Sequence, residues 1–296
     1  MTTTLTRPDG TEPADLHVSR RSFAALVAAG YAVFSSGANA APITTPTDGL
    51  VTGEVALGNG LPAFVARPDT KGRHGVVIVV NEVFGVHEYI RDICRRFAKL
   101  GHVAIAPEFF HRGDPDGMLA QTTDFTVIRK IVGLAKNEQV MGDVGAALEW
   151  LAAQPFVAAD RIGITGFCWG GTVVWMAAAR FPQIKAGVAW YGRLAGPKAG
   201  DPPAAEVRKY PLDVAADLKA PVLGLYGGLD KGIPATDVDA MRAALKAAGK
   251  TGSDLIVYPN AEHGFHADYR PSYNEAAAKD GWTRLLAHFK AHRVTD

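Results

Sequence analysis

The chain has 296 residues, of which 48% are hydrophobic and 21% are charged, and its formal net charge at pH 7 is +1. This length and apolar content suffice to bury one large core or two smaller ones. The balanced charge gives no indication of a nucleic-acid surface, and the two cysteines, Cys94 and Cys168, exclude a disulfide scaffold and a zinc site built from paired CxxC motifs.

Residues 1–41 differ in pattern from the rest of the chain. The pair Arg20-Arg21 precedes an alanine-rich apolar stretch that ends at Phe34, and Ala-Asn-Ala follows at 38–40. Basic residues, a short apolar stretch and an A-x-A site form a cleavable export signal, and the arginine pair resembles a twin-arginine signal. The apolar stretch is shorter than the ~20 residues of a membrane-spanning helix. We therefore expect export by the twin-arginine machinery, cleavage near Ala40 and a periplasmic mature protein; a disordered basic leader is the alternative.

Residues 42–50 have the composition of a linker, and residues 51–296 show the pattern of one α/β domain. Apolar and β-branched segments predict strands at 55–57, 63–66, 75–80, 102–106, 161–165, 186–190, 222–226 and 255–258. Helical spacing of apolar residues predicts helices at 90–100, 140–151, 170–180, 238–248 and 282–289. The first two strands flank Gly-Asn-Gly and predict a hairpin, whereas turn residues in 111–137 predict an irregular loop. Alternating strands and helices predict a mostly parallel sheet with helices on both faces.

The most informative segment is Gly-Phe-Cys-Trp-Gly-Gly at 166–171, between a predicted strand and a predicted helix. A tight strand-to-helix turn of this kind exposes a strained nucleophile in α/β-hydrolases. Gly166 and Gly170 stand where a Cβ would collide with a neighbouring element. The partial positive charge of the helix N-terminus favours the thiolate of Cys168. A buried, inert cysteine is the alternative, and a phosphate loop is disfavoured because its Lys-Ser/Thr is missing.

An acid and a histidine follow Cys168 in the order that this fold requires. Asp230 and His263 each come just after a predicted strand, and the carboxyl ends of parallel strands carry functional groups. His263 would act as general base and acid, and Asp230 would hold its ring. The competitors are His266 for His263, and Asp237 and Asp239, expected to be solvated on the next helix, for Asp230.

Glu82 stands at the end of a wholly apolar strand, where a solvated carboxylate is unexpected. We therefore expect it to face the same site; a structural ion pair is the alternative.

Four segments together resemble the dienelactone hydrolase family: Asn-Glu-Val-Phe-Gly at 81–85, Gly-Phe-Cys-Trp-Gly-Gly at 166–171, Gly-Gly-Leu-Asp at 227–230 and Glu-His-Gly-Phe at 262–265. The resemblance runs from about residue 50 to the C-terminus. It implies an α/β-hydrolase that cleaves a small ester or lactone through an acyl-enzyme on Cys168, without a cofactor.

The resemblance also implies roles around the nucleophile. Glu82 would hydrogen-bond the Cys168 thiol at rest and take its proton when substrate arrives. The backbone N–H groups of Trp169 and Val83 would form an oxyanion hole. Further side chains expected to line the substrate site are Phe84, Tyr191, Arg112, Arg129 and Arg270.

The chain departs from the family pattern in the arginines that hold the carboxylate of dienelactone. One of them follows the histidine, and the residue at that spacing here is Ala267, with Arg270 shortly after. The other lies in the 111–137 loop, where Arg112 and Arg129 are candidates. Whether an acidic lactone is accepted therefore stays open.

The same residues leave other functions open. A thioesterase or a peptidase could use the same scaffold, and a secreted binding protein with a vestigial site is the alternative of another class. No ligand cluster at metal spacing is present in the sequence, and His102, His111 and His266 are interpreted as surface or loop histidines. Cys94 lies on an apolar helix face and is expected in the core, although a Cys94–Cys168 bridge stays open for an exported protein.

Overall fold

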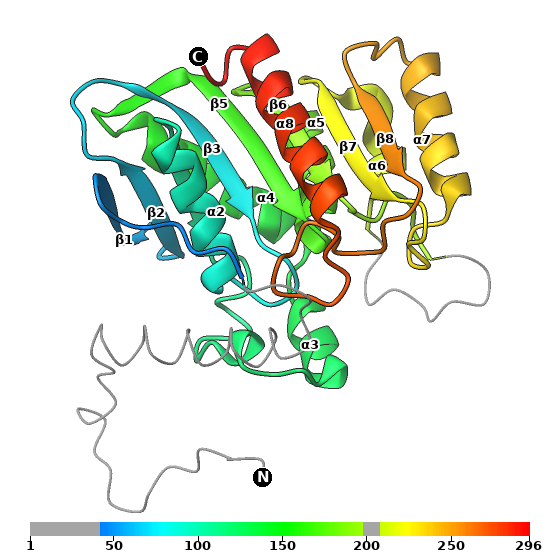
Figure 1. Cartoon of the computed structure of the whole chain (residues 1–296), viewed down its shortest axis with the longest axis horizontal. Coiled ribbons are helices and arrows are strands. Elements are labelled where there is room, and N and C mark those ends of the chain that lie inside the picture. Colours follow the sequence, from blue (N-terminus) through cyan, green and yellow to red (C-terminus); the bar gives the residue numbers. More distant parts are fainter. Residues whose placement is uncertain (1–41, 198–207) are drawn as a thin grey trace, which may run out of the picture.

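The computed structural model describes residues 42–197 and 208–296 (Figure 1). The predicted export signal, with its cleavage site near Ala40, lies outside these residues. The described chain forms one eight-stranded sheet in the order β1-β2-β4-β3-β5-β6-β7-β8. Its strands are β1 (Leu50–Ala56), β2 (Pro62–Pro68), β3 (His74–Val80), β4 (Val103–Pro107), β5 (Val157–Phe167), β6 (Ile184–Trp190), β7 (Val222–Gly227) and β8 (Asp254–Tyr258).

The sheet is mostly parallel, as the alternating pattern predicted. Strands β1 and β2 form the predicted antiparallel hairpin, and β2 also pairs antiparallel with β4. All other neighbours are parallel. The central strand β3 carries only apolar residues from Val76 to Val80, and all five are fully buried, because helices cover a parallel sheet on both faces.

Helices lie on both faces of the sheet, which confirms the predicted fold class. They are α2 (Glu88–Lys99), α3 (Phe125–Val132), α4 (Asn137–Ala152), α5 (Trp169–Arg180), α6 (Pro211–Val214), α7 (Ala235–Ala247) and α8 (Glu275–Ala291), with short 3-10 turns at Met118–Ala120 and Ala215–Asp217. Figure 1 shows α2 and α8 in front of the sheet and α4 and α5 behind it. Helix α2 ends as predicted, since Gly101 adopts a left-handed φ of 90° just beyond it.

The prediction of an irregular loop over 111–137 was wrong in its second half. Residues 125–132 form α3, and the Asp124 side chain caps that helix by accepting a hydrogen bond from the Thr126 N–H at 2.8 Å. Asp124 and the apolar residues Val127, Ile128 and Ile131 are the start signal and the spacing of a short amphipathic helix. The short helix α6 was not predicted either.

Two histidines expected at the surface or in ordinary loops are buried. His102 is 6% exposed, and His266 is 3% exposed. His266 does lie in a loop, but its Nδ1 is 2.6 Å from the Tyr89 hydroxyl oxygen. Cys94 is fully buried on α2, as its apolar helix face predicted.

Residues 42–49 have no regular structure but are bonded to the domain. The Thr45 N–H donates to Asp92 Oδ1 at 2.6 Å, and the Ile43 N–H donates to Asp268 Oδ2 at 3.4 Å. Arg96 contacts both carboxylates, at 2.7 Å and 2.6 Å. This segment therefore connects α2 with the loop that follows β8.

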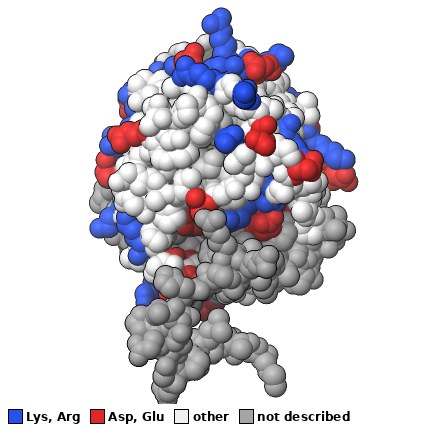
Figure 2. Space-filling view, turned by 90° about the vertical axis from the view of Figure 1, so that its left-hand side faces the viewer, with Lys and Arg blue, Asp and Glu red and all other residues white. Residues whose placement is uncertain are grey.

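The surface carries charges of both signs. Figure 2 shows basic and acidic side chains intermixed, with uncharged areas between them and no extended field of one sign on the face drawn. Among the described residues, no helix is long and apolar enough to cross a membrane.

Packing of α8 on the sheet provides a test of the fold. Phe289 is fully buried, and its ring packs against Phe97 and against β5 at Gly163. Truncating a buried Phe to Ala leaves a cavity, so Phe289→Ala should lower the free energy of unfolding by ~3–5 kcal/mol. Urea denaturation measures this loss. The matched control is Lys290→Ala on the exposed side of the same helix, and an equal loss in both variants would contradict the packing described.

Candidate active site

Cys168 occupies a tight turn between β5 and α5. Its backbone is strained, with φ 55° and ψ −116°. A Cβ added at Gly166 would lie 2.4 Å from the Gly170 carbonyl oxygen, and one at Gly170 would lie 2.5 Å from the Val80 carbonyl oxygen. Only glycine fits at these two positions, so the sequence dictates the turn that exposes the sulfur.

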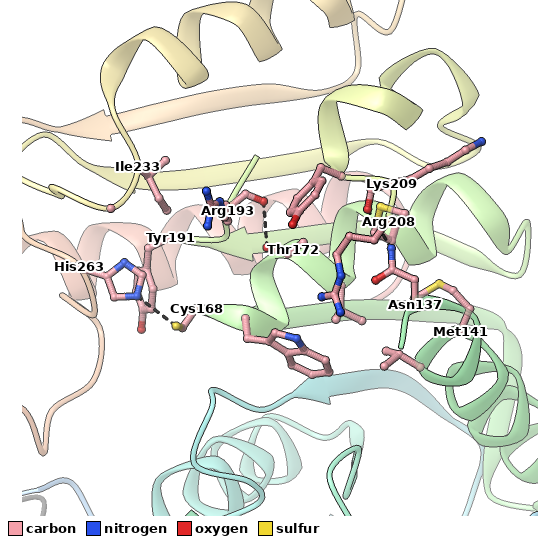
Figure 3. A pocket seen from close by; sticks show the side chains of 16 residues that line it. Asn137, Met141, Cys168, Thr172, Tyr191, Arg193, Arg208, Lys209, Ile233 and His263 are labelled. Carbon is pink, nitrogen blue, oxygen red and sulfur yellow. Dashed lines mark hydrogen bonds between the residues drawn. The ribbon is translucent and has the colours of Figure 1, made fainter. Parts of the chain in front are cut away.

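Cys168, Asp230 and His263 come together at the carboxyl edge of the sheet, each after one of the parallel strands β5, β7 and β8. Asp230 follows β7 and His263 follows β8. Asp230 Oδ2 lies 2.7 Å from His263 Nδ1, and His263 Nε2 lies 3.1 Å from Cys168 Sγ. Figure 3 shows the imidazole of His263 turned toward the sulfur. The other oxygen of Asp230 accepts the Gly232 N–H at 2.8 Å, which fixes the carboxylate.

The surroundings favour a protonated His263. Burial alone would lower the pKa of this ring, but the negative charge of Cys168 and the hydrogen bonds to Asp230 and Cys168 outweigh it and raise the pKa to about 10. One ring nitrogen of His263 therefore faces the sulfur of Cys168, and the other faces a buried carboxylate.

The competing residues lie elsewhere. Asp239 is exposed on α7 and pairs with Arg242 at 3.0 Å, and Asp237 lies on the same helix. His266 points to Tyr89, and burial lowers its pKa far below the usual value. Of the alternatives weighed, His263 is the histidine that contacts Cys168, and Asp230 is the acid that contacts His263.

Glu82 is fully buried next to this site, but the hydrogen bond to Cys168 that the family resemblance implied is absent from the described residues. Tyr269 donates its hydroxyl to Glu82 Oε2 at 2.5 Å, and Arg270 Nη1 lies 3.5 Å from Glu82 Oε1. A charged guanidinium and a phenol are stronger partners for a carboxylate than a thiol. Glu82 thus pairs with Arg270 at the edge of the same site, and a structural ion pair was the alternative to its predicted catalytic role.

The predicted oxyanion donors lie on two different elements. Trp169 is the first residue of α5, where N–H groups have no partner within the helix. Val83 follows β3, and its N–H has no hydrogen-bond partner in residues 42–197 and 208–296. Gly170 approaches the carbonyl groups of residues 80 and 81, so the start of α5 and the end of β3 are held close together.

Of the three candidate arginines, the structure brings only Arg270 to the site. Arg270 contacts Glu82 and lies over the ring of Phe84, 5.8 Å from its centroid. Arg112 instead forms two hydrogen bonds to Asp143, at 2.8 Å and 2.9 Å, and lines a different depression. Arg129 is exposed on α3. Ala267 is fully buried and offers no charge.

A cavity of about 320 Å³ opens beside Cys168 and His263 (Figure 3). Tyr191 lines it, as predicted; its side chain is buried, and its hydroxyl has no hydrogen-bond partner among the described residues. The remaining walls are mostly apolar, and Arg208, Lys209 and Tyr210 add polar and basic groups from the segment before α6. The other residues that line the cavity are Asn137, Val140, Met141, Trp169, Thr172, Val173, Met176, Arg193, Gly232 and Ile233. Sequence reasoning missed most of these residues, because no motif marks them.

Both cysteines are free thiols in the structure. Burial raises the pKa of Cys94 far above its usual value, which makes this thiol unreactive, whereas Cys168 is half-buried and lines the cavity. Within the described ranges, no group of three or more histidine, cysteine, aspartate or glutamate side chains could hold a metal ion.

Comparison with known proteins gives consistent matches. Residues 61–293 match the sequence model of the dienelactone hydrolase family. A Methylorubrum extorquens protein named "Putative carboxymethylenebutenolidase" is 48% identical over 256 residues, covering 85% of each chain. An Escherichia coli K12 protein of the same name is 46% identical over 272 residues, covering 89% of this chain and 95% of that one. A solved structure from Klebsiella pneumoniae, titled "Putative Dienelactone Hydrolase", has a TM-score of 0.75 at 46% identity and covers 81% of this chain and 98% of its own.

The protonation of His263 can be tested directly. Its raised pKa means that the bound proton stabilises the fold fully below pH 6.5, and that this contribution is lost as the pH rises to about 10. Ring ¹⁵N NMR should find His263 protonated up to about pH 10 in the wild type, and Asp230→Asn should lower that pKa. His288, whose pKa burial lowers to about 4, is the internal reference. Titration of His263 near pH 6.5 in the wild type would contradict the raised pKa of this ring.

Proposed function

The chain belongs to the dienelactone hydrolase family and is a hydrolase of carboxylic esters or lactones; from this premise we propose that Cys168, His263 and Asp230 form its catalytic triad and that the reaction passes through an acyl-enzyme. The observation that carries the proposal is the 3.1 Å contact between His263 Nε2 and Cys168 Sγ, continued at 2.7 Å from Nδ1 to Asp230. A nucleophile, a base and an orienting acid within hydrogen-bond reach are the arrangement that nucleophilic catalysis requires.

The proposed reaction assigns one step to each of these groups. The Cys168 thiolate adds to the carbonyl carbon, and the N–H groups of Trp169 and Val83 stabilise the oxyanion. The C–O bond breaks, the His263 imidazolium gives its proton to the leaving alkoxide, and the acyl group stays on sulfur as a thioester. Neutral His263 then takes a proton from water as that water attacks, and the thiolate leaves while the acid product forms. Asp230 holds the ring and stabilises its charged form.

We assign Glu82 a different part from that implied by the family resemblance. His263, rather than Glu82, contacts the sulfur and is the group that accounts for a thiolate. Glu82 fixes Arg270 and Tyr269 at the edge of the site through their bonds to its carboxylate. Arg270 then offers a cation next to Phe84 for an acidic substrate, although Glu82 already offsets part of its charge.

The cavity supports a small substrate. A volume of about 320 Å³ is at the lower end of the ~300–1,000 Å³ typical of ligand pockets. Its apolar walls suit a compact acyl group or a lactone ring. A thioester or a peptide could react with the same three residues, so a substrate panel of lactones, esters, thioesters and amides separates these alternatives. The complete set of reacting groups argues against a vestigial site in a binding protein.

Removing the sulfur should abolish catalysis. Because the nucleophile begins every step, Cys168→Ala should lower kcat for a lactone and for p-nitrophenyl acetate by at least ~10³-fold. In the wild type, rapid quenching and intact-mass measurement should detect the mass of the acyl group on Cys168.

Cys94→Ala is the control, since this buried thiol lies in the core on α2 and should affect stability rather than the chemical step. Iodoacetamide should likewise label Cys168 much faster than Cys94. Wild-type turnover by Cys168→Ala would rule out the proposed triad.

We also propose that the twin-arginine machinery exports the protein and that cleavage near Ala40 releases it into the periplasm. The support is the order of the Arg20-Arg21 pair, the apolar stretch and the Ala-Asn-Ala site in residues 1–41. Export in the folded state would leave both cysteines as thiols, with Cys94 already buried in the core.

Cell fractionation of the full chain tests the export route. Replacing Arg20 and Arg21 by Lys should move most of the protein from the periplasmic to the cytoplasmic fraction, at the mass of the uncleaved chain. Arg7→Lys, outside the pair, is the matched control. A periplasmic wild type whose mass still includes residues 1–40 would contradict the cleavage site, and a cytoplasmic wild type would contradict export.

A further inference from the structure

Glu108 follows β4 directly, at the carboxyl edge of the sheet, and it contacts the segment that follows the neighbouring strand β3. We call residues 81–86 the oxyanion loop, since Val83 in it supplies one proposed oxyanion donor. Glu108 Oε2 accepts the N–H of Val86 at 2.8 Å. The Glu108 backbone is itself fixed, because its N–H donates to the Pro62 carbonyl oxygen of β2 at 2.8 Å.

The oxyanion loop is shaped to admit this carboxylate. Gly85 has a left-handed φ of 72°, and a Cβ added there would lie 3.1 Å from Glu108 Oε1 and 3.3 Å from Oε2. Arg91 Nε also donates to the Val86 carbonyl oxygen, at 3.1 Å. Val86 is thus bonded through its N–H and through its carbonyl group, to two side chains of opposite charge from two different elements.

Bonds at Val86 matter because Val83 is only three residues away. The carbonyl oxygen of a bound substrate needs its donors about 3 Å away, and small displacements of such donors reduce the rate strongly. The Val83 N–H has no partner of its own among the described residues, so its direction depends on how the loop is held.

We propose that Glu108 is a positioning residue for the reaction: its carboxylate holds the oxyanion loop at Val86 so that the Val83 N–H faces the oxygen of the substrate carbonyl. The inference rests on the proposed function, since it needs an oxyanion formed at Cys168. Glu108 touches neither the sulfur nor His263 in the structure, and it acts through the backbone of the loop.

The charge of Glu108 changes near neutral pH. Burial raises the pKa of Glu108 to about 7, against the hydrogen bond from the Val86 N–H, which lowers it. The charged groups that face it are Asp114, which raises the pKa further, and Arg91 on α2, which lowers it. An ionised carboxylate is a stronger acceptor than a neutral carboxylic acid, so the loop is held more firmly above pH 7 than below it.

The test compares two variants of Glu108 in the full chain. Glu108→Met keeps the length of the side chain and removes the acceptor, and it should lower kcat for p-nitrophenyl acetate by ~10- to 100-fold, because a displaced donor loses most of the ~10²–10³-fold effect of an oxyanion-hole group. KM should change less than about threefold, since the donor acts mainly on the transition state. Glu108→Gln keeps an acceptor oxygen, so its kcat should lie close to that of the wild type. The kcat of the wild type should rise between pH 6 and 8 as Glu108 ionises, whereas that of Glu108→Gln should not.

Alkylation of Cys168 by iodoacetamide separates positioning from damage to the fold. This reaction displaces iodide from a saturated carbon and forms no oxyanion, so its rate in Glu108→Met should equal that of the wild type. The control Glu275→Gln removes the exposed partner of Lys279 on α8, which has no contact with the oxyanion loop in the described part of the chain, and should leave kcat unchanged. Unchanged kcat in Glu108→Met, or a loss of kcat matched by an equal loss of alkylation rate, would overturn the role of Glu108. Activity retained by Cys168→Ala would instead refute the proposed function on which it rests.

Discussion

The site depends on how closely β5, α5 and β3 approach one another at Cys168. Gly166 and Gly170 leave no side chain between these elements, and the carbonyl groups of residues 80 and 81 lie within contact of the helix start. This crossing aims the N-terminus of α5 at the sulfur and places the residues after β3 beside it. The contact with His263 follows, since β7 and β8 continue the same parallel sheet and end at the same edge.

Two buried carboxylates near Cys168 each hold a basic side chain. His263 is held by Asp230 on one side, and Glu82 is held by Arg270 and Tyr269 on the other. In both pairs the carboxylate is the more deeply buried member, and His263 lines the cavity. Buried carboxylates that are fully bonded keep their partners in place at a lower cost than isolated ones would. The proposed catalytic histidine is therefore oriented by a carboxylate that does not itself line the cavity.

Local patterns in the sequence were sufficient to predict the eight strands and five of the helices in the described residues. They also identified Cys168, His263 and Asp230, which the structure brings into contact in that order. The apolar runs, the glycines of the turn and the order of Asp230 and His263 are features of short segments, and the sheet brings them together without further information. The missed helix α3 had a cap at Asp124 and suitable spacing, so it was within reach of the same reasoning. The partners of Glu82 and Arg112 were not, because they depend on contacts between residues far apart: Glu82 meets Arg270 across 188 positions, and Arg112 meets Asp143 across 31. The pairing with Asp143 also occupies Arg112, which was one of two candidates for a substrate-binding arginine.

The segment before β1 limits where the chain can be trimmed. Its Ile43 and Thr45 amides satisfy two carboxylates, Asp268 and Asp92, that are almost completely excluded from water. The proposed cleavage at residue 40 keeps both amides. Cleavage beyond residue 45 would remove the donors of two buried carboxylates, which is costly. Because Asp268 lies in the same loop as His263, this loss would act close to the active site. Residues 42–45 are thus an integral part of the fold rather than an expendable tail, and a shortened recombinant version should begin no later than residue 42.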